Sequence, residues 1–448
     1  MGGRRPWPVR QYAFVAVVAL VLGAAIARAN AVVALVVPAT IGVLLLIGAQ
    51  RFLRDPEGDW ADEARLGRWT MGAFGAHLLF GVAVTYTPAA LKYLGGDANT
   101  YHVYATWMLE FGKSSLGKYG LERGKEGFYY TLLGLYKVFG PHQVAGLALN
   151  ATLGAALVPI VTDSTRRLFG RVAARNVAPI VVLLPGIFLF TSQLLKEASI
   201  LFLVAVATNA AIRTMQRFSF AAIAATAVSV SVLLTFRAPV AVVLGGSLLL
   251  GMTLGKRQVL SGFTTGLGTL AVLAVMVTSV GIGYSGFEST LQKSNLAESN
   301  KIRQGLAYQS GTGFGSDVDT GTTRKALAYL PIALVKFGFG PFPWEIRGAR
   351  QLPALVDVIA LWILWPSLGR GLRHSVRERK RQAAVIIVPA FAVAAVLSLS
   401  VGNLGVLVRE RMQVLVLVVP LMAYGLSLRA RPPATEDAVA PAPVTVPA

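Results

Sequence analysis

The feature that most constrains this chain is a succession of apolar runs, each long enough to cross a lipid bilayer. A transmembrane helix needs about 17 to 25 predominantly apolar residues. The sequence therefore predicts an all-α polytopic membrane protein with about 12 transmembrane helices. The runs are 12–28, 31–48, 70–88, 142–161, 174–190, 194–212, 218–236, 238–254, 259–283, 352–369, 384–402 and 410–428.

The composition supports a membrane protein and excludes several kinds of site. Only 14% of the 448 residues are charged, whereas soluble domains carry about 25%. Cysteine is absent, which excludes a disulfide framework, a thiolate nucleophile and a cysteine metal site. The formal net charge of +21 could suggest a nucleic-acid partner. We expect no such partner, because the basic residues recur in short clusters between apolar runs.

These basic clusters predict the orientation of the chain. Cytoplasmic loops of membrane proteins are enriched in lysine and arginine, and here the basic clusters fall in alternate connections. We therefore expect a multi-pass protein of the cell membrane with both termini in the cytoplasm and two long outer connections, 89–141 and 284–351. The basic clusters are Arg51, Arg54, Arg65 and Arg68; Arg166, Arg167, Arg171 and Arg175; Arg213 and Arg217; Lys256 and Arg257; Arg370, Arg373, Arg377, Arg379, Lys380 and Arg381; and Arg429 and Arg431.

The first outer connection opens with a carboxylate among glycines and aromatic residues. Asp97 follows Gly95 and Gly96, and if it starts a short helix, Tyr101 and Tyr104 lie on the face of that helix one and two turns later. Such a helix would form a pocket wall with one ionisable group and two aromatic donors. An aspartate after two glycines is also an ordinary helix cap, so both interpretations stay open.

Both outer connections contain segments suited to the membrane surface. The aromatic-rich segment 128–136 is typical of a helix that lies in the headgroup plane. In the second connection, the polar stretch 285–323 precedes an apolar segment that ends in the proline-rich residues 341–345. We expect an interfacial or re-entrant segment there, because proline disfavours a plain transmembrane helix.

Charged residues border the outer ends of three predicted spans. Ionisable groups in such places are costly and suggest a functional site, although each could also be an interfacial side chain that extends to water. With Asp97, the cluster would suit a lipid-linked anionic substrate, whose phosphate needs cations and whose reacting hydroxyl needs a base. The residues are Lys196 and Glu197, which could also pair with each other, Arg237, and Arg409, Glu410 and Arg411.

Two other motifs are interpreted as structural. The Asp317-Val318-Asp319 sequence resembles the metal-binding pair of nucleotide-sugar enzymes, but it lies in a Gly/Thr-rich outer connection and is read as a solvated turn. His102 is the only histidine near Asp97 in the sequence, and a lone histidine is more often structural than a ligand.

Taken in order, these features resemble the membrane-embedded glycosyltransferases of the C superfamily (GT-C), especially the protein-mannosyltransferase-like and aminoarabinose-transferase-like members. The resemblance covers about 70–430 and predicts a GT-C-like fold with interfacial helices in the first outer loop. It rests on the acid of that loop, a proline-containing helix, an outer loop that closes with aromatic residues and prolines, and the start of the last span. The residues are Asp97, Tyr101 and Ala105; Ser192, Lys196 and Glu197; and Arg409, Glu410, Arg411, Met412, Pro420 and Gly425.

The resemblance implies a reaction and a division of the chain. Such enzymes transfer a sugar, usually with inversion, from a polyprenyl-phosphate donor to a lipid, glycan or protein acceptor at the outer face, and no metal or other cofactor is implied. Residues 1–69 would form two leading transmembrane helices and a cytoplasmic linker, 70–430 the catalytic region, and 431–448 a disordered cytoplasmic tail. Asp97 would be the catalytic base. The substrate-binding residues would be Tyr101, Tyr104, Lys196, Glu197, Arg237, Arg409 and Arg411.

Several alternatives remain at this stage. Members of the family often carry a second acid in the first loop, and Glu110, Glu122 and Glu126 are equal candidates for it. A polysaccharide polymerase or ligase would also use a polyprenyl-linked donor, but it would hold a diphosphate with two or more arginines. A lipid or solute transporter would instead place ionisable residues near the bilayer midplane, and a scaffold for cell-envelope enzymes would leave Asp97 unexplained.

Overall fold

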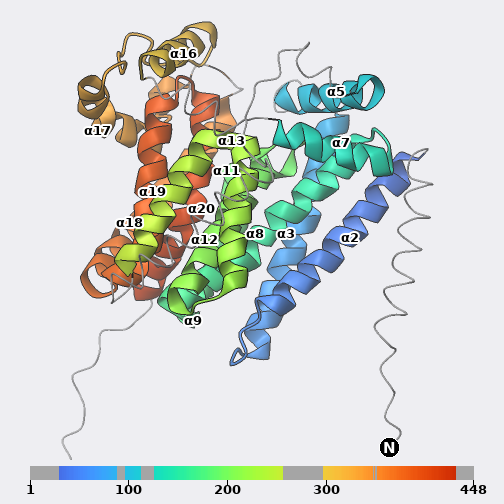
Figure 1. Cartoon of the computed structure of the whole chain (residues 1–448), viewed down its shortest axis with the longest axis horizontal. Coiled ribbons are helices and arrows are strands. Elements are labelled where there is room, and N and C mark those ends of the chain that lie inside the picture. The colour runs from blue at the N-terminus through green and yellow to red at the C-terminus, as the bar shows by residue number, and fades with distance from the viewer. Residues whose placement is uncertain are drawn as a thin grey trace, which may run out of the picture.

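The computed structural model describes residues 30–87, 96–112, 126–255, 296–346, 348 and 351–429. In these ranges the chain folds into helices, and the only strand-like feature is an isolated bridge between Gly313 and Asn403. The elements (Figure 1) are α2 (Ala31–Phe52), α3 (Trp60–Tyr86), α5 (Gly96–Phe111), α7 (Gly127–Phe139), α8 (Gln143–Phe169), α9 (Arg171–Ala174), α10 (Val177–Leu183), α11 (Pro185–Ser192), α12 (Glu197–Gln216), α13 (Phe220–Gly255), α16 (Leu296–Gln309), α17 (Thr323–Phe339), the 3-10 helix η1 (Pro343–Glu345), α18 (Leu352–Glu378), α19 (Lys380–Ser400) and α20 (Leu404–Arg429).

The described residues form an α-helical membrane protein. Seven of their helices, namely α2, α8, α12, α13, α18, α19 and α20, are long and apolar enough to cross a membrane, and a bent pair of segments at 171–192 raises this number to eight. The expected total of about 12 stays a prediction, because the runs 12–28 and 259–283 and the tail 431–448 lie outside the described residues. The run 70–88 lies largely in α3, so the predicted domain boundary after residue 69 falls inside a helix.

Two of the predicted spans belong to α13, which folds back on itself. The backbone of Arg237 is not helical (φ −159°, ψ 79°), and Pro239 disfavours a regular helix at this point. A Cβ atom on Gly245 would lie 3.2 Å from Cγ1 of Val230, although a straight helix would separate these positions by about 22 Å. The two arms of α13 therefore pack side by side, and Arg237 lies at their tip.

The expected span 174–190 is also broken, and the break has buried polar support. The segments 171–183 and 185–192 meet at an angle of 58°, and a short irregular stretch separates α11 from α12. Carbonyl groups that leave a helix inside a membrane protein need other donors. The Asn150 side-chain amide of α8 donates to the carbonyl oxygens of Gln193 (2.5 Å) and Leu195 (2.8 Å), which fixes the stretch that leads into Glu197.

The basic connections gather at one end of the bundle, which we call the basic end. Arg171 pairs with Asp55 (2.6 Å) in the connection between α2 and α3, and Arg379, between α18 and α19, donates to the carbonyl oxygen of Leu168 (3.0 Å). The opposite end, which we call the Asp97 end, carries α5, α7, α16 and α17, and α5 lies across it (Figure 1). The described connections that the sequence identifies as basic thus lie at one end of the bundle, and the Asp97 segment lies at the other.

α20 packs at the centre of this bundle against α8, α12, α18 and α19, and glycine allows its closest approach. A Cβ atom on Gly425 would lie 1.8 Å from the carbonyl oxygen of Ser367 in α18. Small residues allow the backbones of membrane helices to approach in this way.

We predict that Gly425→Ala destabilises the protein by about 1 to 3 kcal/mol, because the added methyl group must push α18 and α20 apart. Thermal unfolding of the purified protein in detergent measures the effect. Gly369→Ala in α18 is the matched control, since a Cβ atom there meets nothing within 4 Å and alanine favours a helix. An equal loss of stability in the two variants would contradict the close approach.

Candidate active site

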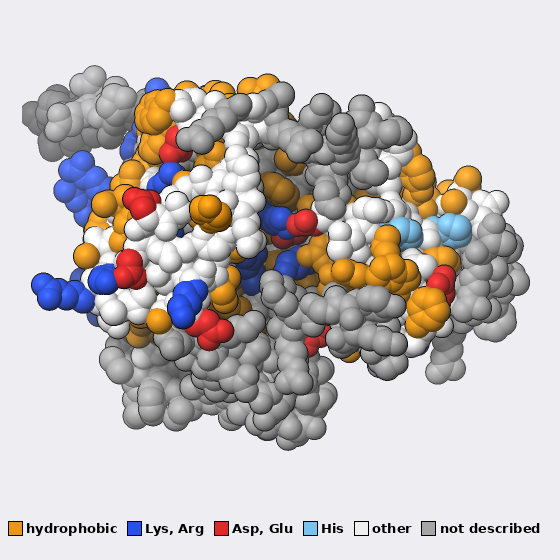
Figure 2. Space-filling model, turned by 90° about the horizontal axis from the view of Figure 1, so that it is seen from above, with side chains coloured by type: hydrophobic (Ala, Val, Ile, Leu, Met, Phe, Trp, Pro, Cys, Tyr) orange, Lys and Arg blue, Asp and Glu red, His pale blue; other side chains and the backbone are white. Residues whose placement is uncertain are grey.

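The Asp97 end holds a cluster of charged side chains contributed by four helices that are distant in the sequence. Viewed from this end, Figure 2 shows acidic and basic side chains gathered near the middle of the face, between the part formed by α16 and α17 and the part formed by α5 and α7. Ion pairs and a hydrogen bond at this end join a set of residues that we call the charged cluster, namely Asp97, Lys196, Glu197, Arg237, Arg409 and Glu410.

The first turns of α20 direct three successive charged residues toward different neighbours. Arg409, Glu410 and Arg411 follow one another in a regular helix, so their side chains leave it about 100° apart. Each is at least partly buried, and a buried charge needs a partner of opposite sign or several hydrogen bonds. Each of the three residues therefore needs an ion-pair partner from a different neighbouring helix.

Arg409 joins two carboxylates from different parts of the chain. Its Nη1 and Nη2 atoms both lie 2.7 Å from Oδ2 of Asp97, at the start of α5, and Nη1 lies 3.5 Å from Oε1 of Glu197, at the start of α12. Each carboxylate lies in the first turn of its helix, where the helix dipole favours a negative charge. The Asp97 side chain is 56% exposed and that of Glu197 only 2%.

The other two cations of the charged cluster, Arg237 and Lys196, lie near Glu410, the residue that follows Arg409. Arg237, at the tip of α13, forms an ion pair with Glu410, and Ser400 Oγ lies 3.4 Å from the other oxygen of that carboxylate. The Nζ atom of Lys196 lies 3.5 Å from the carbonyl oxygen of Phe236, next to Arg237. Together with Arg409, three cationic side chains thus lie near the N-terminal end of α20.

The two tyrosines of the Asp97 helix have different surroundings. α5 begins at Gly96, as the sequence predicts, and Tyr101 packs edge-on against Phe128 of α7 with ring centroids 5.0 Å apart. Burial, together with the nearby Glu197 carboxylate, raises the pKa of Tyr101 well above its usual range, so its hydroxyl stays protonated and can donate a hydrogen bond. Both tyrosines contact Tyr129 of α7, and Tyr104 also packs against Trp107 of its own helix.

Arg411 does not join the charged cluster, which differs from what its position in the sequence suggested. Its Nη2 atom lies 2.7 Å from Oδ2 of Asp357 in α18, and both side chains are 1% exposed. Nη1 donates to the carbonyl oxygens of Gly340 (2.5 Å) and Phe337 (3.3 Å). These contacts tie α20 to α18 and to the end of α17, so we assign Arg411 a role in holding the helices together.

Among the described residues, the acid that shares Arg409 with Asp97 is Glu197. Glu110 is exposed near the far end of α5, about 20 Å along the helix from Asp97. Glu126 immediately precedes α7, and Glu122 lies outside the described residues. Neither oxygen of Glu197 has a hydrogen-bond partner in the described part of the chain. The signal in the sequence was an acid immediately after a helix break at the end of a span.

The two motifs interpreted as structural have protein partners. Asp319 pairs with Lys325 (2.5 Å) and accepts from the backbone N–H of Gly321 (2.8 Å), as in a solvated turn. The Nδ1 atom of His102 lies 2.8 Å from the hydroxyl of Tyr136, and burial lowers the pKa of this histidine. The described residues contain no group of three or more acidic or histidine side chains suited to hold a metal ion.

Two comparisons with known proteins found no relative of this chain. A scan against protein-family models finds no match, and a search of curated proteins finds none. The interpretation of the charged cluster therefore depends on its own chemistry and geometry.

We predict that Arg411→Met destabilises the fold by about 3 to 5 kcal/mol, because it leaves the Asp357 carboxylate buried without its cation. The double variant Arg411→Met/Asp357→Leu should regain most of that loss, since an apolar pair removes the uncompensated charge. Thermal unfolding in detergent measures both. A double variant no more stable than the single one would show that the pair does not act as a unit.

Proposed function

We propose that this chain is a membrane glycosyltransferase of the GT-C type, which transfers a sugar from a polyprenyl-phosphate donor to an acceptor at the outer membrane face. The observation that carries the proposal is the Asp97–Arg409–Glu197 arrangement, with Arg237 and Lys196 beside it. This arrangement combines an accessible carboxylate, a buried carboxylate and several cations, as such a transfer requires.

In this reaction, Asp97 is the general base. Its Oδ2 atom contacts Arg409, while more than half of the side chain is exposed, so Oδ1 can accept the proton of an acceptor hydroxyl. The acceptor oxygen bonds to the anomeric carbon as the bond from that carbon to the phosphate oxygen breaks. The electron pair of that bond leaves with the polyprenyl phosphate, and the proton of the acceptor passes to Asp97.

The cations stabilise the donor and its leaving group. Guanidinium groups bind phosphate oxygens with well-defined geometry, and Arg409 and Arg237 both lie in the charged cluster. A phosphate that binds Arg409 competes with Asp97 for the same N–H groups, so donor binding would release the carboxylate for its role as base. Glu197 keeps Arg409 in place, because its buried carboxylate lies 3.5 Å from Nη1 of that arginine.

The topology belongs to the same proposal. With the basic end in the cytoplasm, as the positive-inside rule favours, the charged cluster is extracytoplasmic, and the termini are cytoplasmic. The chain then has about 12 spans, two of them leading, and α5 and α7 lie in the headgroup plane. The partners are a polyprenyl-phosphate sugar, a lipid, glycan or protein acceptor, and the membrane itself.

A second candidate is a polysaccharide polymerase or ligase with a polyprenyl-diphosphate donor. The specific observation in its favour is that two arginines belong to the charged cluster: Arg237 is paired with Glu410, and Arg409 directly precedes that residue in α20. Two arginines so placed could hold two phosphates. The identity of the bound lipid distinguishes this candidate from the transferase.

We predict that Asp97→Asn lowers the transfer rate about 100-fold or more, since a positioned general base contributes about that much. The assay uses the protein in liposomes with a lipid extract of its own membranes, and mass spectrometry detects released polyprenyl phosphate. Glu110→Gln is the matched control on the same helix and should keep the wild-type rate. Full activity of Asp97→Asn with unchanged thermal stability would reduce Asp97 to a helix cap.

We also predict that native mass spectrometry of the protein, after exposure to the same lipid extract in nanodiscs, detects a retained polyprenyl-phosphate sugar. Arg409→Ala should weaken its retention, whereas Arg373→Ala, at an exposed position near the basic end of α18, should not. A prenyl diphosphate with several sugars would favour the polymerase or ligase. Retention of no prenyl lipid by the wild type would contradict both candidates.

A further inference from the structure

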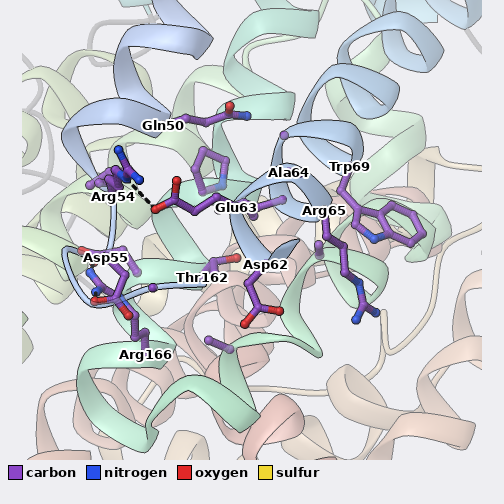
Figure 3. A pocket seen from close by; sticks show the side chains of 18 of the residues that line it. Gln50, Arg54, Asp55, Asp62, Glu63, Ala64, Arg65, Trp69, Thr162 and Arg166 are labelled. Atoms are coloured by element: carbon purple, nitrogen blue, oxygen red, sulfur yellow. Dashed lines mark hydrogen bonds and ion pairs between the residues drawn. The ribbon is translucent and has the colours of Figure 1, made fainter. Parts of the chain in front are cut away.

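A second site lies at the basic end, far from the charged cluster. Here α2, α3, α8, α9 and α10 enclose a cavity of about 450 Å³, and Figure 3 shows polar and charged side chains from α2, α3 and α8 around it. None of its lining residues belongs to the charged cluster. The transfer reaction proposed for the Asp97 end makes no use of this cavity.

The wall of the cavity changes from apolar to charged in the same direction along three helices. α2 and α8 run toward the basic end, and α3 starts from it. The apolar lining residues Ile47, Leu66 and Pro159 therefore lie deeper in the bundle than the charged ones at the ends of their helices. Such a gradient matches a molecule with an apolar tail and an ionic head.

The level of the charged part of the cavity in the membrane is indicated by Trp60. Trp60 and Trp69 both line it, and Trp60, the first residue of α3, is 77% exposed. Tryptophan is enriched where a membrane protein crosses the headgroup region. The charged part of the cavity thus lies at the depth of lipid headgroups.

Two arginines in this wall have no acidic partner in the described part of the chain. Four others are paired, for example Arg54 with Glu63 (2.7 Å; Figure 3) and Arg175 with Asp62 (2.8 Å). Arg51 and Arg65 line the same cavity and form no such pair with any described residue. They provide a positive charge that the neighbouring acids do not neutralise.

A buried donor lies next to Arg51. The side-chain nitrogen of Gln50 is shielded from solvent and has no hydrogen-bond partner among the described residues, and Gln50 lines the cavity next to Arg51. Buried amide groups in folded proteins are nearly always hydrogen-bonded. The Gln50 amide can donate to a ligand oxygen when its side chain turns into the cavity that it lines.

We propose that this cavity binds an anionic phospholipid, with its phosphate on Arg51 and Arg65, an ester or phosphate oxygen on Gln50, and its acyl chains along the apolar part of the wall. Basic pockets between transmembrane helices bind lipid headgroups in this way. Together with the charged cluster, the protein would then hold lipid phosphates at both ends of the bundle. The proposal stands whether or not the chain is a transferase.

The test is a titration of the full-length protein with phosphatidylglycerol in detergent, followed by native mass spectrometry. We expect Arg51→Gln/Arg65→Gln to weaken the tightest binding about tenfold or more, because each arginine near a lipid phosphate contributes about 1 kcal/mol. The matched control is Arg373→Gln/Arg377→Gln, which removes the same charge at exposed positions of α18 and should leave binding within a factor of about two. Equal weakening in both pairs would overturn the proposal.

A second pair of variants tests the cavity without changing charge. Gly67 lines it, and a Cβ atom there would meet only the side-chain oxygen of Gln50, at 3.6 Å, so Gly67→Leu should fill the space and abolish the tight binding. Gly72→Leu, on the same helix where a Cβ atom meets nothing within 4 Å, should leave the binding unchanged. Tight binding that survives in Gly67→Leu would place the lipid elsewhere.

Two competitors identify the chemistry of the ligand. Phosphatidylcholine should bind more weakly than phosphatidylglycerol, because its headgroup has no net charge. Inorganic phosphate should not displace the phospholipid, since it gains nothing from the apolar wall. Equal binding of the two lipids would exclude recognition of an anionic headgroup, and displacement by phosphate would make the cavity a simple anion site.

Discussion

The structure depends on the burial of three successive charges at the start of its central helix. Arg409, Glu410 and Arg411 could not remain in α20 unless other elements supplied partners, because an unpaired charge in a membrane protein is very costly. Asp97 and Glu197 neutralise the first, Arg237 the second and Asp357 the third. These contacts connect α5, α12, α13 and α18 to one turn of helix. Arg409 and Glu410 both fix the packing and belong to the candidate site, whereas Arg411 and Asp357 serve the packing alone.

Breaks in the helices deliver the partners to that turn. The fold in α13 places Arg237 at a tip, and the irregular stretch before α12 places Glu197 in a first helical turn. Irregular backbone in a membrane protein has to find hydrogen bonds within the protein, and the Asn150 amide supplies two of them. The uncharged Asn150 side chain thus supports the position of Glu197 through the backbone that precedes it.

The charged side chains at the two ends of the bundle differ in how they are paired. At the Asp97 end a few acids and cations compete for one another, so a bound phosphate can change their partners, as the proposed transfer requires. Of the six arginines that line the cavity at the basic end, four are paired with acids, and the other two have no acidic partner among the described residues. This second arrangement suits steady binding of a lipid more than chemistry.

The sequence by itself determined most of the helical segments, which connections are basic and that a helix starts near Asp97, because these properties depend on local periodicity, composition and capping. It did not indicate α16 in the polar stretch 285–323 or the break in the span 174–190. The sequence also indicated that charged residues lie at the outer ends of three predicted spans. Only the tertiary structure decided which partner each charge has: Arg409 reaches Asp97 across 312 positions, while Arg411, two residues later, turns to Asp357. Helical geometry fixes the direction of a side chain around its own axis, but the identity of the neighbouring helix depends on how the whole bundle packs.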